Sequence, residues 1–247
     1  MNTKRPAAQR PNTHRPNTPR PSAQGPSAKR PSRRPTPRQL LQLVLLAGVV
    51  GLIALLVVFI LNSRPEVPAD GAQVVRENSH VLNEASDEKA VLVEFLDFEC
   101  EVCRAYYPTV EQLKEQYRDD LTLVIRYFPI PSHANSTNAA VAVEAAAAQG
   151  QLEPMYQRMY ETQAEWGESQ DSKAELFRGF AEELGLDMDE FDAAVADPAT
   201  TERVQSDFEE GQVLGVSGTP TFFLDGEKLD TQSPADLVGA VEAVLGR

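Results

Sequence analysis

The chain changes its hydrophobic periodicity at its only two cysteines. Residues 90–98, "AVLVEFLDF", form a continuous apolar run rich in β-branched and aromatic side chains, which is typical of a buried central strand. From residue 104 to residue 117 the apolar side chains recur at helical spacing instead. Residues 121–130, "LTLVIRYFPI", again have the composition of a strand. The order strand, helix, strand predicts a β-α-β unit, with Cys100 and Cys103 at the first turn of its helix.

The rest of the chain after this unit is mostly helical. Residues 136–213 contain several helix-forming segments and no convincing strand. Residues 218–229 return to strand with an Asp-Gly hairpin signal, and Ser233 is the expected N-cap of a final helix. The sequence therefore predicts an α/β fold in the order β-α-β, helical insert, β-β-α. Pro108 lies inside the first helix and predicts a kink there.

The N-terminal part of the chain divides into three segments. Residues 1–38 carry ten Lys or Arg, no Asp or Glu and nine prolines, which predicts a disordered basic arm. Residues 39–61 include 22 consecutive uncharged residues, and a helix of that length spans about 33 Å, enough for a hydrocarbon core of about 30 Å. We expect a transmembrane anchor here; a cleaved signal peptide and a buried core helix are the alternatives. Residues 62–73 then form a linker to one domain, 74–247.

Charge separates the arm from the rest of the chain and predicts its orientation. All ten arm charges precede the apolar run, so the positive-inside rule places residues 1–38 in the cytoplasm and the domain on the other side of a cell membrane that the chain crosses once. The part after the arm has 13 basic against 37 acidic residues. This negative surplus argues against nucleic-acid binding by the domain. The arm is either a solvated topogenic tail or a segment that binds anionic lipid or nucleic acid.

The spacing of Cys100 and Cys103 is compatible with three kinds of chemistry. A zinc site requires two further Cys or His ligands, and His14, His80 and His133 offer no matching spacing. A structural disulfide between these cysteines would close a short loop and stabilise little. A redox pair fits better, because the free N–H groups and the positive end of the dipole at a helix N-terminus stabilise a thiolate. This predicts an exposed, reactive Cys100 and an inner Cys103 that attacks its sulfur, with no metal and no cofactor.

Glu94 and Pro220 are residues that would serve such a pair. Glu94 lies in the apolar strand, an expensive place for a carboxylate unless it exchanges a proton with Cys103; the alternative is a solvated glutamate at the sheet edge. Pro220 precedes a strand that would be central. It is either an ordinary trans proline at a strand start or the cis partner of Thr219, beside the cysteines, in an element that docks peptides.

These motifs in this order resemble the DsbA-like branch of the thioredoxin superfamily. The resemblance rests on "VEFLDFECEVC", on Pro108, on the helical segments of the insert and on "GVSGTPTFFLDG", and it covers residues 74–246. It implies a thioredoxin fold interrupted by a helical insert, with Cys100 as the nucleophile and Cys103 as the resolving thiol.

The resemblance also assigns roles to residues outside the cysteine pair. It implies that Glu94 is the buried acid of the site, that Pro220 is the cis-proline and that Thr219 presents backbone groups to the substrate. His133 is similar to a histidine of this branch to which no role is assigned.

The residues between the cysteines depart from this resemblance. Oxidising relatives often carry Pro-His there, whereas this chain has Glu101 and Val102, with Glu99 immediately before the first cysteine. Two carboxylates oppose a thiolate, each by about 0.3 to 1 kcal/mol if exposed. We expect Glu99 and Glu101 to tune the redox potential toward a weaker oxidant, which leaves the direction of the reaction open.

The sequence thus predicts a membrane-tethered thiol-disulfide oxidoreductase that forms disulfides in exported proteins carrying thiols. The resemblance implies that an integral-membrane, quinone-linked partner reoxidises it. One alternative is a disulfide reductase or isomerase, for example in cytochrome c maturation. The other is a non-catalytic module that holds extended peptides in the groove beside Pro220.

Overall fold

A five-stranded mixed sheet lies at the centre of the part of the chain, residues 72–246, that the computed structural model describes. The strand order is β1-β3-β2-β4-β5, with β2 parallel to β3 and every other neighbouring pair antiparallel. The strands are β1 (His80–Asn83), β2 (Ala90–Leu96), β3 (Leu121–Tyr127), β4 (Thr221–Leu224) and β5 (Glu227–Lys228).

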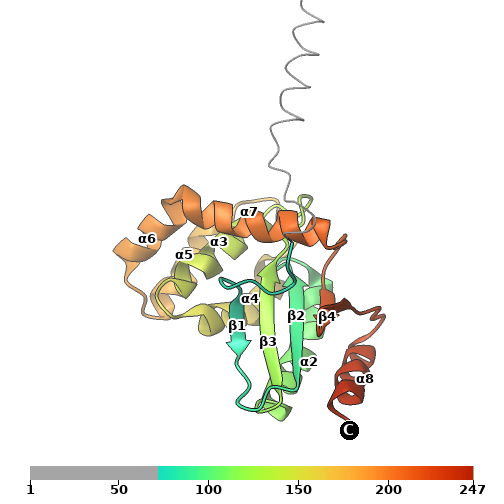
Figure 1. Cartoon of the computed structure of the whole chain (residues 1–247). Helices are drawn as coiled ribbons and strands as arrows, with labels where there is room; N and C mark the ends of the chain where they lie inside the picture. The colour runs from blue at the N-terminus through green and yellow to red at the C-terminus, as the bar shows by residue number, and fades with distance from the viewer. Residues whose placement is uncertain (1–71, 247) are drawn as a thin grey trace, which may run out of the picture. The chain divides into compact units, whose positions relative to one another are not determined.

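Helices surround this sheet within the described residues. They are α2 (Glu101–Gln116), α3 (Ser136–Ala147), α4 (Leu152–Trp166), α5 (Ala174–Glu183), α6 (Met188–Ala196), α7 (Pro198–Val213) and α8 (Pro234–Leu245). Figure 1 shows α7 running across the upper end of the sheet, α3, α5 and α6 gathered beyond the β1 edge, and α8 beyond β4. The helices α3 to α7 occupy the chain between β3 and β4, so the sheet is completed only after the chain returns from them.

The element order agrees with the sequence prediction, apart from one strand. The hairpin turn falls at Asp225 and Gly226, with φ of 51° and 83°, and Ser233 caps α8 by accepting the backbone N–H of Asp236. Pro108 lies inside α2, which continues through it. The strand β1 is the element that the sequence did not predict, because four residues of mixed polarity pair with β3 only through the tertiary fold.

The expected transmembrane segment, residues 39–61, lies outside the described residues, as do the arm at 1–38 and most of the linker. Within 72–246, none of the helices combines the length and the apolar character that a membrane crossing requires.

The two faces of the sheet bury different sets of side chains. Because side chains alternate along a strand, Leu92 and Leu96 of β2 face one side and Val93 and Phe95 face the other. The first face belongs to the larger apolar cluster, which includes buried side chains of α2 and α8. Glu94 shares this face by register, so the strand itself directs its carboxyl group toward the α2 side of the sheet.

The helix α7 packs closely on the opposite face. A side chain at Gly211 would place its Cβ 2.8 Å from Phe128 Cδ2 and 3.1 Å from Phe95 Cδ1, so only glycine permits this approach. Val93, Phe95 and Phe128 form the smaller apolar cluster, against which the partly buried Phe208 packs.

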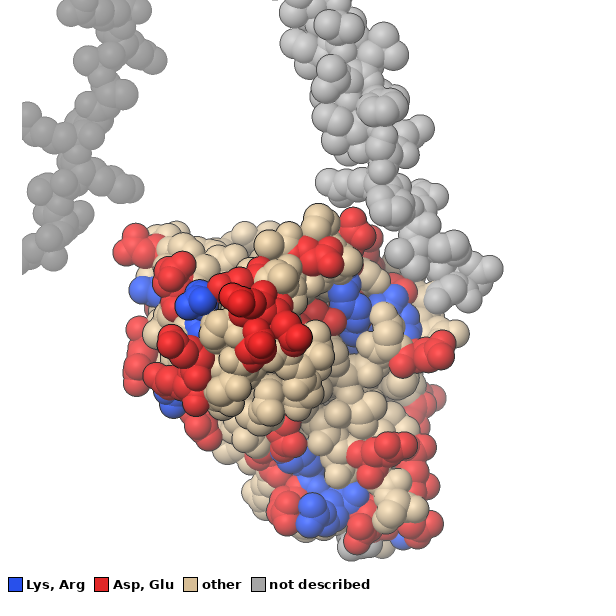
Figure 2. Space-filling model, turned by 90° about the vertical axis from the view of Figure 1, so that its left-hand side faces the viewer, with Lys and Arg blue, Asp and Glu red and all other residues tan. Residues whose placement is uncertain are grey.

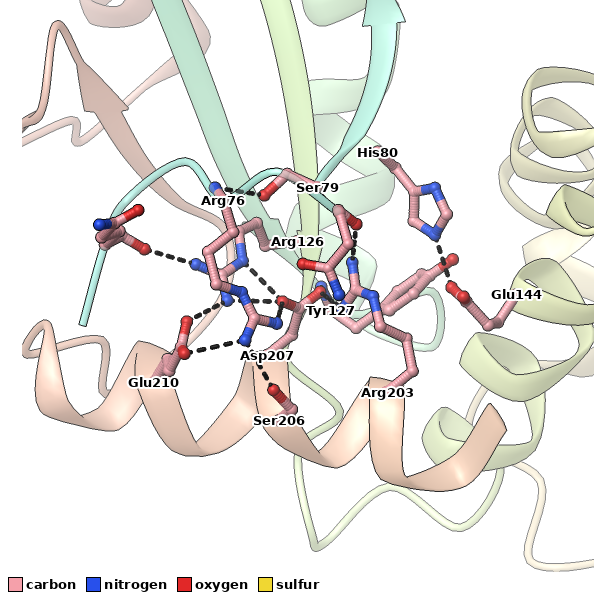
Figure 3. Close-up of polar contacts among 12 residues, drawn as sticks. Arg76, Ser79, His80, Arg126, Tyr127, Glu144, Arg203, Ser206, Asp207 and Glu210 are labelled. Atoms are coloured by element: carbon pink, nitrogen blue, oxygen red, sulfur yellow. Dashed lines mark hydrogen bonds and ion pairs between the residues drawn. The ribbon is translucent and has the colours of Figure 1, made fainter. Parts of the chain in front are cut away.

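A buried ion-pair network fixes α7 to β3 (Figure 3). The side chains of Arg126 and Asp207 are both fully buried, and Arg126 Nη2 lies 2.6 Å from Asp207 Oδ1 and 2.7 Å from Glu210 Oε2. Arg76 and Arg203 also pair with Asp207, at 3.2 and 2.6 Å. Because each buried charge meets an opposite charge and several hydrogen bonds, the network ties the start of the described chain, β3 and α7 together.

Candidate active site

The two cysteines lie where β2 gives way to α2. Cys100 is the N-cap of α2 with an extended backbone, and Cys103 is one turn inside the helix. Both are free thiols in this structure. The expectation that Cys100 is exposed is wrong: it is 5% exposed and Cys103 is fully buried. The reason is tertiary, since the loop before β4 lies against Cys100 Sγ, which contacts the carbonyl oxygen of Thr219 at 3.4 Å.

The environment of Cys100 favours its thiolate. A hydrogen bond from Cys103 has the largest effect, and the pKa of Cys100 falls from 9.0 to about 6 although burial opposes this. The Thr219 side chain and the backbone N–H groups of Val102 and Cys103 lower the pKa further. The Thr219 hydroxyl is buried and has no hydrogen-bond partner among the described residues, so it is available to donate to the thiolate. Cys100 is therefore largely ionised at neutral pH when the pair is reduced.

The surroundings of Cys103 and Glu94 raise their pKa values, in contrast to those of Cys100. Burial raises the pKa of Cys103, and its hydrogen bond with Cys100 and the charges of Cys100 and Glu94 raise it further. Glu94 is 1% exposed, and burial, with the charges of Cys100 and Glu111, raises its pKa from 4.5 to about 8. The structure therefore rules out a solvated Glu94 at a sheet edge. A carboxyl group that titrates near neutral pH beside a buried thiol can exchange a proton with it.

Aromatic rings form the apolar surroundings of this buried pair. Tyr107 of α2 stacks on Tyr160 of α4 with ring centroids 5.2 Å apart, and Tyr156 packs edge-on against both at 5.7 and 5.2 Å. Phe98 contacts Tyr160 at 5.2 Å. These rings exclude water, which explains why burial dominates the pKa values of both Glu94 and Cys103.

The Thr219-Pro220 peptide bond is cis, and this places Thr219 against the nucleophile. Both residues are half-buried and immediately precede β4, which pairs with β2. The backbone of Thr219 therefore lies beside the cysteine site, in contact with Cys100 Sγ.

Glu99 and Glu101 occupy different environments. Glu99 is 2% exposed, and its Oε2 accepts the backbone N–H of Asn135 at 2.6 Å. Glu101 is exposed, and a hydrogen bond with Glu168 lowers the pKa of Glu101 and raises that of Glu168. The sequence-based picture of two exposed acids beside Cys100 therefore holds for Glu101 and not for Glu99.

Asp97 and His133 belong to the site although the sequence assigned them no role. The carboxylate of Asp97 is buried and accepts Ser136 Oγ at 2.6 Å and the backbone N–H groups of Glu99 and Ile130 at 2.9 and 3.0 Å. Its Oδ2 also lies 2.7 Å from His133 Nδ1. Burial lowers the pKa of His133, but this contact and the charges of Asp97, Cys100 and Glu99 raise it overall. A histidine outside the C-x-x-C sequence thus lies within reach of the charge on Cys100.

Gln163 is a further residue that the sequence analysis missed. It lies on the buried face of α4, and its Nε2 donates to the carbonyl oxygens of Phe98 and Cys100. A polar residue on an otherwise apolar helix face is the signal that could have identified it. Among residues 72–246, no three His, Cys, Asp or Glu side chains form a cluster suited to a metal ion.

Comparison with known proteins identifies the family. Residues 82–243 match the family model described as thioredoxin. The Na(+)/H(+) antiporter NhaA of Herminiimonas arsenicoxydans is 36% identical to this chain over 155 residues, which are 63% of this chain and 24% of the antiporter. The chain spans about a quarter of the length of the curated relatives that it matches.

Solved structures share the fold. A thioredoxin-like oxidoreductase from Silicibacter pomeroyi DSS-3 has 25% sequence identity and a TM-score of 0.59, covering 71% of this chain and 97% of its own. Alpha-DsbA1 from Wolbachia pipientis has 18% sequence identity and a TM-score of 0.59, covering 70% of this chain and 93% of its own. The predicted mixed α/β thioredoxin-like fold with helices is therefore confirmed. With its paired cysteines at a helix N-terminus, the chain belongs to the thioredoxin family and has the site of a thiol-disulfide oxidoreductase.

Proposed function

We propose that this chain forms disulfides in exported proteins, as a thiol-disulfide oxidoreductase tethered to the outer side of a membrane. The observation that carries the direction of the reaction is the lowered pKa of Cys100, about 6. A stable thiolate stabilises the reduced form of the pair, and a protein whose reduced form is stabilised is an oxidant toward other thiols. The donors around Cys100 thus oppose the effect expected of Glu101.

The reaction proceeds by two exchanges. A substrate thiolate attacks Cys100 Sγ of the oxidised pair, the bond between the two cysteine sulfurs breaks, and Cys103 leaves as a thiolate that takes the proton of Glu94. A second substrate thiolate then attacks the substrate sulfur of the mixed disulfide, and Cys100 leaves as the stabilised thiolate. The substrate loses two electrons and two protons: the pair gains the two electrons, one proton replaces the one that Glu94 gave to Cys103, and the other passes to water. The backbone at Thr219 and Pro220 holds the substrate chain during both steps.

Two features support the membrane context. Residues 39–61 are long and apolar enough to form an anchor, and the matched relatives are named as antiporters, which reside in membranes. We propose that residues 1–38 lie in the cytoplasm, that the domain lies outside, and that an integral-membrane electron acceptor reoxidises the pair. A reporter fused after residue 247 that is active only outside the cytoplasm tests the orientation; activity of a cytoplasmic reporter there would reverse it.

The redox potential tests the direction of the reaction. We expect the Cys100 and Cys103 couple, equilibrated with glutathione, to be more oxidising than roughly −250 mV. A value well below this would assign the chain to the reductases. Trapping tests catalysis itself: Cys103→Ala should accumulate mixed disulfides through Cys100 in cells, whereas Cys100→Ser with Cys103→Ala should accumulate none. Full biological activity of a variant that lacks both cysteines would favour the non-catalytic peptide-binding module.

A further inference from the structure

We propose that Gln163, on α4 of the helical insert, is a positioning residue that holds Cys100 in its reactive geometry. Its Nε2 donates to the carbonyl oxygen of Phe98 at 2.7 Å and to that of Cys100 at 2.9 Å. Gln163 is 2% exposed, and the buried residues of the same helix include Tyr160 and Trp166. The inference rests on the thiol-disulfide function proposed above and extends it to a residue 60 positions along the chain from the second cysteine.

The two carbonyl groups that Gln163 joins lie at the bend between β2 and α2. The strand ends at Leu96, so Phe98 and Cys100 are both beyond the sheet. The Cys100 oxygen also accepts the N–H of Arg104 at 3.1 Å, which is the first hydrogen bond of α2. Buried carbonyl groups require donors. Because a single amide group supplies one to each, it fixes the position of the first helical turn relative to the strand.

This geometry determines how well the helix N-terminus stabilises a charge on Cys100. The backbone N–H groups of Val102 and Cys103 act on the thiolate, and their direction depends on how α2 begins. The N–H group of Gln163 that donates to the Cys100 carbonyl oxygen also offsets the partial negative charge on that oxygen. Without the Gln163 amide, the Cys100 thiolate is less stable. The reduced form of the cysteine pair is then less stable as well. Gln163 thereby makes the insert a part of the redox centre.

The neighbouring contacts show why Gln163 has this role and the other anchors do not. Asp97 and Glu99 also bind the insert side of the loop, but through their own side chains, and their partners are Ser136 and the backbone of Asn135. Gln163 alone among these contacts reaches the backbone of the nucleophilic cysteine itself.

The test compares three variants of the full chain. Gln163→Leu removes both donors at similar volume, and Gln163→Glu keeps the shape but replaces the amide donors by carboxyl oxygens. We expect each to raise the pKa of Cys100 from about 6 to about 7, read from thiolate absorbance against pH. The equilibrium constant with glutathione should change by about tenfold toward a weaker oxidant, equivalent to about 30 mV.

The matched control is Gln149→Leu. Gln149 makes the same kind of contact in the insert, since its Nε2 donates to the Asp187 carbonyl oxygen at 2.9 Å and its Oε1 accepts the Asp187 N–H at 2.8 Å. This variant should leave the pKa of Cys100 and the glutathione equilibrium unchanged. If Gln149→Leu changes the pKa of Cys100 and the glutathione equilibrium as much as Gln163→Leu does, the inference is overturned. Equal changes would mean that any lost contact in the insert affects Cys100.

If Gln163→Leu folds and both its Cys100 pKa and its equilibrium constant with glutathione are unchanged, the inference on Gln163 is also overturned. If Gln163→Leu does not fold, the same two measurements on Gln163→Glu decide. These measurements use only the chain and glutathione. A wild-type chain that cannot oxidise a reduced peptide would therefore reject the proposed function and leave the result on Gln163 standing.

Discussion

Glu94 links the chemistry of the site to the stability of the protein. Its carboxyl group ionises near 4.5 in an unfolded chain but only near 8 in the folded one. Between these values the folded state holds a proton that the unfolded state has lost, so the free energy of unfolding falls as the pH rises from about 4.5 to about 8. The acid is thus retained at a cost to stability.

Replacing this acid should separate stability from catalysis. We expect Glu94→Gln to be more stable than the wild type at pH 8 by up to about 4 kcal/mol and similar to it near pH 4. Turnover should fall at least about tenfold, because Cys103 loses its proton partner. Urea unfolding at both pH values and oxidation of a reduced peptide measure the two effects. Equal stability differences at the two pH values would contradict the assignment of the titration to Glu94.

The hydrogen bond between the two thiols also makes a separate prediction. Because Cys103 is the main cause of the low pKa of Cys100, Cys103→Ala should raise that pKa from about 6 by roughly one. The pH dependence of alkylation by iodoacetamide measures this directly. An unchanged profile would show that the helix N-terminus and Thr219 suffice to stabilise the thiolate.

The two acids beside Cys100 should respond differently to substitution. Glu101→Gln removes an exposed charge, so we expect it to lower the pKa of Cys100 by less than about 0.5, with little effect on stability. Glu99→Gln replaces the buried charged acceptor of the Asn135 N–H by a neutral amide oxygen and should cost about 1 kcal/mol of stability. Thiolate titration and urea unfolding of both variants distinguish these roles. A larger change in the pKa of Cys100 in Glu99→Gln than in Glu101→Gln would reverse the assignment.

At the scale of elements, α7 is held to the sheet by charge as well as by apolar contact. Arg126 also lies over the Phe95 ring, 5.1 Å from its centroid, so the same guanidinium group contributes to ion pairs and to the smaller apolar cluster. The position of α7 therefore depends on Asp207, which meets Arg126, Arg76 and Arg203 together.

Loss of this carboxylate should loosen the helix without altering the cysteines. We expect Asp207→Asn to lower the free energy of unfolding by about 3 kcal/mol, because the fully buried Arg126 then keeps only Glu210 as a negatively charged partner. Asp192→Asn is the matched control, since Asp192 pairs with Arg178 at the surface and should matter little. Urea unfolding compares the two variants. The pKa of Cys100 should stay unchanged in both, because α7 lies on the sheet face opposite α2.

At the scale of the whole molecule, the sequence predicted the order of elements better than the contacts between them. The strand before Cys100 and the helices of the insert have strong local patterns, whereas β1 is four residues long and forms only because β3 is beside it. The burial of Glu99 and the roles of Asp97 and Gln163 depend on partners 36 to 65 positions away. No local sequence pattern specifies such contacts. The sequence therefore predicted Cys100, Cys103 and Glu94, but not Asp97 and Gln163, which position the loop around them.

The negative charge of the part after residue 38 predicts which substrates approach fastest. Acidic side chains are spread over the face seen in Figure 2, with basic ones in small groups, and the part after residue 38 has 37 acidic against 13 basic residues. We expect basic peptides to be oxidised faster than acidic ones at low ionic strength, with the ratio shrinking as salt screens the field. Stopped-flow measurements with a matched pair of dithiol peptides test this. A ratio independent of salt would show that the field does not steer them.

The ion-pair network also has a mechanical consequence. Arg126 Nη1 donates to the carbonyl oxygens of Gln73 and Val74, at 2.7 and 3.4 Å, where the described chain begins. In the proposed tethered arrangement, a force on the tether acts on the domain at Gln73 and Val74. The load would then pass through Arg126 into β3, which lies between β1 and β2, and through Asp207 into α7, on the face of the sheet away from α2. We therefore expect a load on such a tether to leave the geometry of Cys100 and Cys103 unchanged.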